Sequence, residues 1–183
     1  MDKHIKEIII KYGSDIICSD EFVKTFEQTH HKIMTVGDHT LSVTAEAVRL
    51  CLAMRLNDDK TMKSVITASL CHDLGIMGRA EKFRNNAHCC ARHPAESVLV
   101  YKKLTGEEDV RIIDSIKCHM FPIRPGIPRF KEGWVLTVAD KISATRERLG
   151  IPAVNRADRD EILLKAGAVN KTKETQGVKQ DER

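Results

Sequence analysis

The stretch ASLCHDLGIMGR, residues 68–79, places His72 and Asp73 side by side at the end of an apolar run and just before a glycine. The run 59–73 has the length and apolar spacing of a helix, and Gly75 is the type of residue that ends one. Imidazole and carboxylate groups both bind metal ions, and both are costly to bury without a partner. The stretch therefore predicts a helix that carries two metal-competent side chains into the protein interior.

Apolar residues recur every three or four positions elsewhere in the chain, which is the spacing of amphipathic helices. The clearest case is the segment 39–56, in which Leu41, Ala45 and Val48 share one face. No stretch shows sustained alternation of polar and apolar residues, so we expect little or no sheet, and the predicted fold class is all-α. Further helices are predicted at 93–105, 107–119 and 134–149, with shorter ones at 3–11, 20–30 and 158–166.

The length of 183 residues suits one domain with a buried core. No internal repeat is present, and no boundary divides the chain into two domains. We expect a central helical domain at 37–150, preceded by a helical extension at 1–36. Residues 151–183 should hold a short helix followed by a polar tail, NKTKETQGVKQDER, whose composition is typical of disorder.

Charge and composition restrict the possible partners. The net charge is +4, with Lys and Arg spread along the chain, which favours a small anionic substrate over a polyanion. Aromatic residues make up only 4% of the chain, which argues against a stacking surface for nucleic acid. The six cysteines form no CxxC pair and the start, MDKHIKEIIIKYG, lacks a secretory signal, so we expect a reduced, cytoplasmic protein. No apolar run approaches the roughly 20 residues of a membrane span.

The other metal-competent side chains fall on separate predicted helices. His39 opens the first long helix, His93 opens the third, His119 ends the fourth, and Asp140 lies within the fifth. Helix ends and inward faces of different helices can meet at one interior point, which is how helical bundles build metal sites. Together with the pair described above, these residues supply four imidazoles and two carboxylates, enough for two ions.

Imidazole nitrogens suit iron, zinc, manganese or nickel better than magnesium, and a carboxylate can bridge two ions with its two oxygens. The predicted ligands are His39, His72 and Asp140 for one ion, His93 and His119 for the other, and Asp73 for both. Two divalent ions against two carboxylates leave a net positive charge that attracts phosphate and lowers the pKa of a bridging water. The predicted nucleophile is the resulting hydroxide, with His72 and Asp73 as the centre of catalysis.

This order of residues, His, then His-Asp, then His, His and Asp, resembles the HD-domain metal-dependent phosphohydrolase superfamily in its two-metal form. The resemblance covers about residues 37–147. It implies a helical HD-domain bundle with a dinuclear metal site in its core, and hydrolysis of a small phosphoester such as a nucleotide or dinucleotide. The matching stretches are DHTLSVTAEA (38–47), CHDLG (71–75), HPAES (93–97), IKCHM (116–120) and VADKISA (138–144).

Within the superfamily, the segment 119–144 is similar to small single-domain bacterial hydrolases. The layout also resembles the bacterial diadenosine tetraphosphate hydrolases, although their characteristic sequence after the fifth ligand is not reproduced. The GYP signature of cyclic di-GMP phosphodiesterases is absent. Many relatives carry a lysine where this chain has Ile76, so we expect other cations to hold the substrate phosphate. The candidates are Arg79, Lys82, Arg84, Arg92, Arg124, Arg129 and Lys141.

The same ligand order also fits two other functions, and neighbouring histidines and cysteines offer further sites. Some HD-fold proteins are mixed-valent diiron oxygenases with the same ligand order, and a non-catalytic nucleotide-binding domain could also keep these residues. His30 and His31 lie close enough to His39 in sequence to stand behind it or to contact substrate. A separate zinc site could be formed by His88, Cys89, Cys90 and His93. Adjacent cysteines, however, cannot easily both face one tetrahedral ion.

Overall fold

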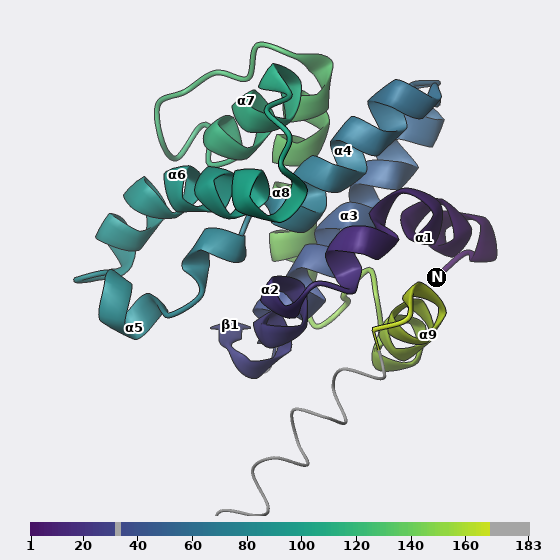
Figure 1. Cartoon of the computed structure of the whole chain (residues 1–183), viewed down its shortest axis with the longest axis horizontal. Coiled ribbons are helices and arrows are strands. Elements are labelled where there is room, and N and C mark those ends of the chain that lie inside the picture. Colours follow the sequence, from purple (N-terminus) through teal and green to yellow (C-terminus); the bar gives the residue numbers. More distant parts are fainter. Residues whose placement is uncertain (32–33, 169–183) are drawn as a thin grey trace, which may run out of the picture.

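The computed structural model describes residues 1–31 and 34–168. This part of the chain folds into nine α-helices, two 3-10 helices and one antiparallel hairpin, which confirms the predicted all-α fold class (Figure 1). The α-helices are α1 (Lys3–Ile17), α2 (Asp20–Val23), α3 (Val36–Ala53), α4 (Asp59–Cys71), α5 (Arg79–Lys82), α6 (Asn86–Thr105), α7 (Val110–Cys118), α8 (Lys131–Arg148) and α9 (Arg156–Ala166). The 3-10 helices are η1 (Lys24–Glu27) and η2 (Leu74–Ile76), and the strands are β1 (Thr29–His31) and β2 (Met34–Thr35).

Helices α3 and α4 pack against each other at the centre of the bundle (Figure 1). Helix α8 packs along α3 and also contacts α4 and α7, while α1 contacts both central helices. Helix α6 packs against η2 and α7. This arrangement brings the end of α4 and the inner faces of α3, α6 and α8 to one region of the molecule.

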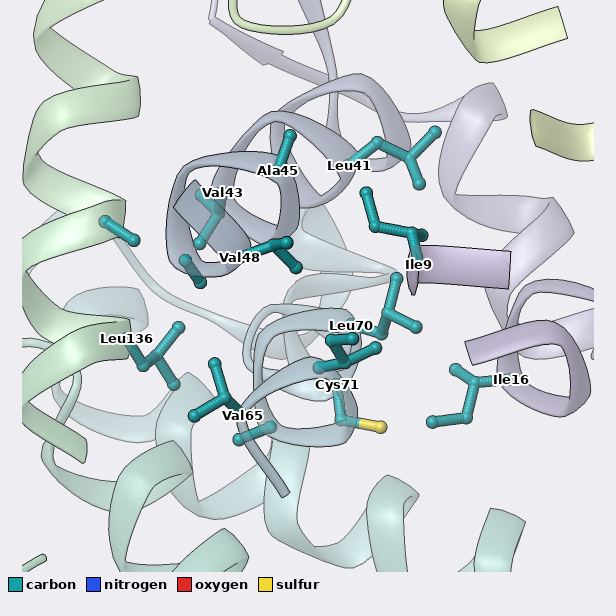
Figure 2. Packing of buried hydrophobic residues seen from close by; sticks show 14 of the residues in the cluster. Ile9, Ile16, Leu41, Val43, Ala45, Val48, Val65, Leu70, Cys71 and Leu136 are labelled. Carbon is teal, nitrogen blue, oxygen red and sulfur yellow. The ribbon is translucent and has the colours of Figure 1, made fainter. Parts of the chain in front are cut away.

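The interior is mostly aliphatic, as expected from the low aromatic content, although Phe22 and Tyr101 are fully buried in it. Figure 2 shows Ile9 and Ile16 of α1, Leu70 of α4 and Leu136 of α8 within one cluster of buried side chains. The same cluster continues to Ile162 of α9. Burying one side chain of this size stabilises the fold by about 1.5–3 kcal/mol. This cluster therefore holds the helices that carry the predicted ligands in fixed positions.

Helix α3 begins at Val36, three residues before the predicted start. Thr35 is its N-cap, and its hydroxyl accepts a hydrogen bond from the Asp38 amide while the Asp38 carboxylate accepts from the Thr35 amide. This reciprocal capping box satisfies two amides that the helix itself leaves unpaired. His39 therefore lies in the first helical turn and does not open the helix.

The prediction that Gly75 caps the helix through 59–73 is wrong. Helix α4 ends at Cys71 with His72 at its C-cap, and Gly75 lies inside η2. A Cβ atom on Gly75 would lie 2.4 Å from the backbone nitrogen of Ser97 and 2.6 Å from the carbonyl oxygen of His93. The residue is therefore a glycine because η2 packs directly on the backbone of α6.

The predicted start of a helix at His93 is also wrong. Helix α6 begins at Asn86, where the side chain of Asn85 caps it by accepting a hydrogen bond from the His88 amide at 2.9 Å. The helix continues through Pro94 to its end. Proline favours the first helical turn, which made a start at His93 the natural prediction. His93 instead lies in the interior of a long helix.

The prediction of a helix at 20–30 is wrong at its end, because this segment divides into α2, η1 and the strand β1. The other helices follow the prediction more closely. Helix α7 ends at Cys118 with His119 at its C-cap, and α8 contains Asp140. Helix α9 packs against α1, where Lys6 donates to Asp158 at 2.9 Å. The predicted division at 1–36, 37–150 and 151–183 stays a prediction, and the tail expected to be disordered lies outside the described residues.

None of the described helices combines the length and the apolar composition that crossing a membrane requires.

Candidate metal centre

The six predicted ligands lie together in the interior, and each has a relative exposure of at most 7%. Helices α3, α6 and α8 contribute side chains from within their length, whereas the ends of α4 and α7 contribute the rest. The ligands are His39 of α3, His72 and Asp73 between α4 and η2, His93 of α6, His119 after α7, and Asp140 of α8.

The carboxylate of Asp73 lies between two pairs of imidazoles. Its Oδ1 is 3.2 Å from Nε2 of His93 and 3.6 Å from Nε2 of His119. Its Oδ2 is 3.5 Å from Nε2 of His72 and 3.9 Å from Nε2 of His39. A carboxylate that bridges two metal ions presents its two oxygens to two different ligand groups in this way.

Three of the four histidines among the predicted ligands are held in one tautomer by backbone carbonyls. A carbonyl oxygen only accepts hydrogen bonds, so the Nδ1 atom that faces it must carry the proton. The neutral ring then has a lone pair on Nε2, which is the form that binds a metal ion. The bonds run from His72 to Ser69 at 2.7 Å, from His93 to Cys89 at 2.9 Å, and from His119 to Ile116 at 2.7 Å.

His39 lies between two carboxylates. Its Nδ1 is 3.0 Å from both carboxylate oxygens of Glu147, and its Nε2 is 3.2 Å from Oδ1 of Asp140. Burial alone would lower the pKa of His39, but the hydrogen bonds to Asp140 and Glu147 outweigh it and raise this pKa to about 10. Burial would raise the pKa of Asp140, but the bond to His39 holds it well below its usual range. Without a metal ion, His39 is thus an imidazolium.

The pKa values of the imidazoles of His93 and His119 are shifted by other causes than that of His39. Burial lowers the pKa of His119 to about 3, and the neighbouring rings of His72 and His93 add to this effect. Burial would also lower the pKa of His93, but the hydrogen bond to Asp73 outweighs it and raises that pKa. The Nε2 atoms of His93 and His119 are 3.0 Å apart. Two lone pairs repel each other at this distance, so this pair of atoms suits a shared proton or a bound metal cation.

The donor set fits divalent transition metals. The Nε2 atom of His72 is buried and has no hydrogen-bond partner among the described residues, although burying such an atom unpaired is costly. Four imidazole nitrogens and two carboxylates match iron, manganese, zinc or nickel better than magnesium. Ligand atoms within 4.8 Å of one another form two groups, one of His39, His72 and Asp140 and one of His72, Asp73 and His119.

The first of these groups has the same members as the ligands predicted for one ion. The second group contains His72 in place of His93, while His93 stays within 3.2 Å of Asp73. The structure therefore brings all six residues together. Their division between two ions stays a prediction.

A cavity of about 330 Å³ opens onto these ligands. All of the six ligands except His72 line it. The rest of the wall is partly apolar and includes Ile76, Met120 and Ile123. The volume falls within the range of small-molecule sites, so the cavity can hold a compact substrate next to the ligands.

Two of the predicted phosphate-binding cations, Arg79 and Lys141, line this cavity. The Lys141 ammonium donates to the Asp140 carboxylate and, at 3.1 Å, to the carbonyl oxygen of His119. Arg129 instead donates from Nε to Asp114 at 2.6 Å. The other predicted cations are absent from the cavity lining in the described part of the chain, namely Lys82, Arg84, Arg92 and Arg124.

The sequence prediction missed Glu147 and Arg148. Glu147 is the partner of His39, and Arg148 lines the cavity. The spacing contains a signal for Glu147, because residues seven apart on a helix share a face and Glu147 follows Asp140 by seven. Arg148 lies in the same last turn of α8.

The alternative zinc site does not form in the described structure. No cysteine belongs to a group of metal-competent atoms among the described residues. Cys89 and Cys90 instead line the cavity described above. The side chains of His30 and His31 lie outside the described part, so the roles considered for them stay predictions.

Comparison with protein families gives a match to the HD domain over residues 36–145. The match begins at the first residue of α3 and ends within α8, so it contains all six predicted ligands and stops just before Glu147. Comparisons with curated proteins and with solved structures gave no match.

Proposed function

The chain belongs to the HD-domain family, whose members are mostly metal-dependent phosphohydrolases, and we propose that it hydrolyses a small phosphoester such as a nucleotide or dinucleotide. The proposal includes two divalent transition-metal ions, each held by imidazoles and joined by Asp73. A cytoplasmic location and a small anionic substrate, both expected from the sequence, stay predictions.

The position of Asp73 carries this proposal. Its two oxygens face different imidazole pairs, His93 with His119 and His39 with His72. A single ion would use only one of these pairs, and a purely structural aspartate would not need four imidazoles around it. The arrangement supports a two-metal phosphohydrolase over a one-metal protein.

Bound divalent ions would supply a water of lowered pKa as nucleophile and positive charge for the phosphoryl oxygens. The protein itself supplies the orientation of each ligand. The backbone carbonyls of Ser69, Cys89 and Ile116 fix three rings, and Glu147 fixes the fourth. Rings fixed in this way need no rearrangement when charge develops during the reaction, which is an advantage in catalysis.

Three cations on the cavity wall are placed to hold the substrate phosphate. Lys141 is anchored beside Asp140, Arg79 donates to the side-chain oxygen of Asn86, and Arg148 lies at the end of α8. Guanidinium groups bind phosphate in bidentate fashion, whereas an ammonium acts as a point charge. We propose that these three replace the lysine that many relatives carry at the position of Ile76.

A substrate panel tests the proposal. Purified protein loaded with manganese or iron should release phosphate or a nucleotide from at least one member of a set of mononucleotides, dinucleoside polyphosphates and cyclic dinucleotides. Protein treated with a chelator should lose this activity and recover it when metal returns. A metal-loaded protein that cleaved none of these compounds would remove the support for hydrolysis.

Two controls separate the alternatives. Hydrolysis needs no oxygen, so manganese-loaded protein should keep its full activity under argon, whereas a diiron oxygenase would consume oxygen and stop. A non-catalytic nucleotide-binding domain would bind members of the panel without product formation. Saturable binding of a nucleotide together with no turnover would favour that alternative.

A further inference from the structure

A second hollow lies beside the metal cavity, on the outer face of α8. Trp134, Val138 and Ile142 recur along this helix at four-residue intervals, so they share a face. Phe121 and Pro122, from the loop after α7, form the other wall. The groove has a volume of about 490 Å³, which is enough for a flat ring system.

The groove is continuous with the metal cavity. Lys141 and Thr145 line both hollows. Lys141 also donates to the carboxylate of Asp140, so the shared wall lies directly beside a predicted metal ligand. Val138 and Ile142 face away from Asp140 on the helix, so Lys141 and Thr145 form the passage between the two hollows. A molecule with its phosphate at the ligands can extend past Lys141 and Thr145 into the groove.

The groove presents apolar, partly aromatic surface to the solvent. Trp134 is 44% exposed and Val138 is 43% exposed, although large apolar side chains are usually buried. The ring of Trp134 meets that of Phe121 edge to face, with centroids 5.7 Å apart, and this contact fixes its orientation. Arg146 at the end of the groove already pairs with Glu46 at 3.3 Å. The wall thus suits a flat uncharged ring more than a second phosphate.

We propose that this groove binds the nucleobase of a nucleotide substrate, with the phosphate at the metal ligands. The inference rests on the proposed function, which it extends by assigning the leaving portion of the phosphoester to a particular surface. Stacking on an exposed aromatic side chain strengthens the binding of a base by about tenfold or more. The groove would therefore select nucleotides over sugar phosphates that lack a base.

Trp134 is the single tryptophan of the chain, so its fluorescence reports on this groove alone. Full-length, metal-loaded protein should show a saturable change in tryptophan emission with adenosine 5′-monophosphate. Ribose 5-phosphate carries the same sugar and phosphate without the base, so it should leave the emission unchanged. Adenosine should give the same change at higher concentration, because it keeps the base and lacks the phosphate.

A pair of variants tests the location. Val138→Asp places a charge in the groove and should weaken adenosine 5′-monophosphate binding at least tenfold. Leu164→Asp makes the same kind of change at an exposed leucine of α9 that lines neither hollow, and it should bind as the wild type does. Circular dichroism of both variants checks that each is folded. Equal binding by the two variants would overturn the proposal.

Two other outcomes would also overturn it. If the protein hydrolyses a nucleotide of the panel but its tryptophan emission does not respond to that nucleotide, the base lies elsewhere. If Val138→Asp converts a dimer into a monomer in sedimentation velocity and leaves nucleotide affinity unchanged, the groove is an interface between two copies. A retained fluorescence response with no turnover on any panel member would instead reject the proposed hydrolysis, and the groove would remain a nucleotide-binding surface.

Discussion

The two sides of Asp73 are built from different chemistry. The carboxylate side consists of His39, His72 and Asp140, and Glu147 supports His39 from behind. The imidazole side consists of His93 and His119, whose Nδ1 atoms donate only to backbone carbonyls in the described structure. Negative charge is therefore concentrated on one side of the bridge and scarce on the other.

The two sides should therefore bind metal with different affinities. The carboxylates raise the pKa of His39 to about 10, whereas burial, followed by its imidazole neighbours, lowers the pKa of His119 to about 3. The carboxylate side attracts a divalent ion strongly but must first release the proton of His39. The imidazole side offers a neutral ring at His119 but less negative charge. We expect the ion on the carboxylate side to be held more tightly.

The largest effect should come from removing the bridge between the two sides. Asp73→Asn keeps the shape of the side chain but removes its charge and one of its two ligand oxygens, so it cannot bridge the two sides. Activity and metal content should fall by more than the roughly 10–100-fold that the loss of an outer partner costs. Metal analysis after gel filtration and steady-state kinetics measure the two effects.

Asp114→Asn is the matched control for this substitution, because Asp114 is also buried but pairs with Arg129 outside the cavity. It should keep the metal content of the wild type even if it lowers stability. Full metal content and full activity in Asp73→Asn would show that the two sides are independent of the bridge.

A smaller effect is expected when only the support of the carboxylate side is changed. Glu147→Gln removes the charge behind His39 and should lower metal affinity on that side by about 10–100-fold. Glu132→Gln is the control, because Glu132 is buried on the same helix but lies outside the cavity. Calorimetric titration should show one weakened binding step in the first variant and none in the second. A Glu147→Gln variant with two unchanged steps would contradict the asymmetry.

Metal affinity on the carboxylate side should also depend on pH. The folded-state pKa of His39 is raised above its unfolded value, so its proton stabilises the metal-free protein fully below about pH 6.5, and this contribution is lost as the pH rises through about 10. A metal ion must displace this proton. Affinity on the carboxylate side should therefore rise with pH between 6 and 9, by at most about tenfold per unit. Titrations at several pH values that gave constant affinity would contradict this assignment.

The smallest effect concerns the packing that positions the bridge. Gly75→Ala would place a Cβ atom 2.4 Å from the backbone nitrogen of Ser97, so η2 must move away from α6. We expect a loss of about 1–3 kcal/mol in the free energy of unfolding, measured with urea on the metal-free protein. Unchanged stability would mean that this contact is looser than the structure indicates.

Helices with a clear apolar pattern were predicted from the sequence, whereas features without such a pattern were not. Apolar periodicity identified α3, α4 and α8, because these helices bury a continuous face in the core. It could not place the start of α6, because the segment 86–92, NAHCCAR, has no large aliphatic residue and its helix begins at the Asn85 cap. Gly75 was likewise ambiguous, since the role of a glycine depends on what packs against it.

The candidate ligands could be predicted from sequence because each is a His or Asp at the end or on the inner face of a helix, in a recognisable order. The hydrogen-bond partners of these ligands could not be predicted in this way. Glu147 reaches His39 across more than one hundred positions of sequence, and only the packing of α8 on α3 brings them together. Arg129 looked equivalent to Arg79 in sequence, but a buried aspartate on α7 binds it.

The number and position of bound ions test the bridging role of Asp73 directly. Crystals of manganese- or iron-loaded protein, measured at the absorption edge of the metal, should show two anomalous peaks, one on each side of the Asp73 carboxylate. One peak should be contacted by His39, His72 and Asp140, and the other by His93 and His119. A single peak, or two peaks of which only one touches Asp73, would contradict the bridging role on which the proposed function rests.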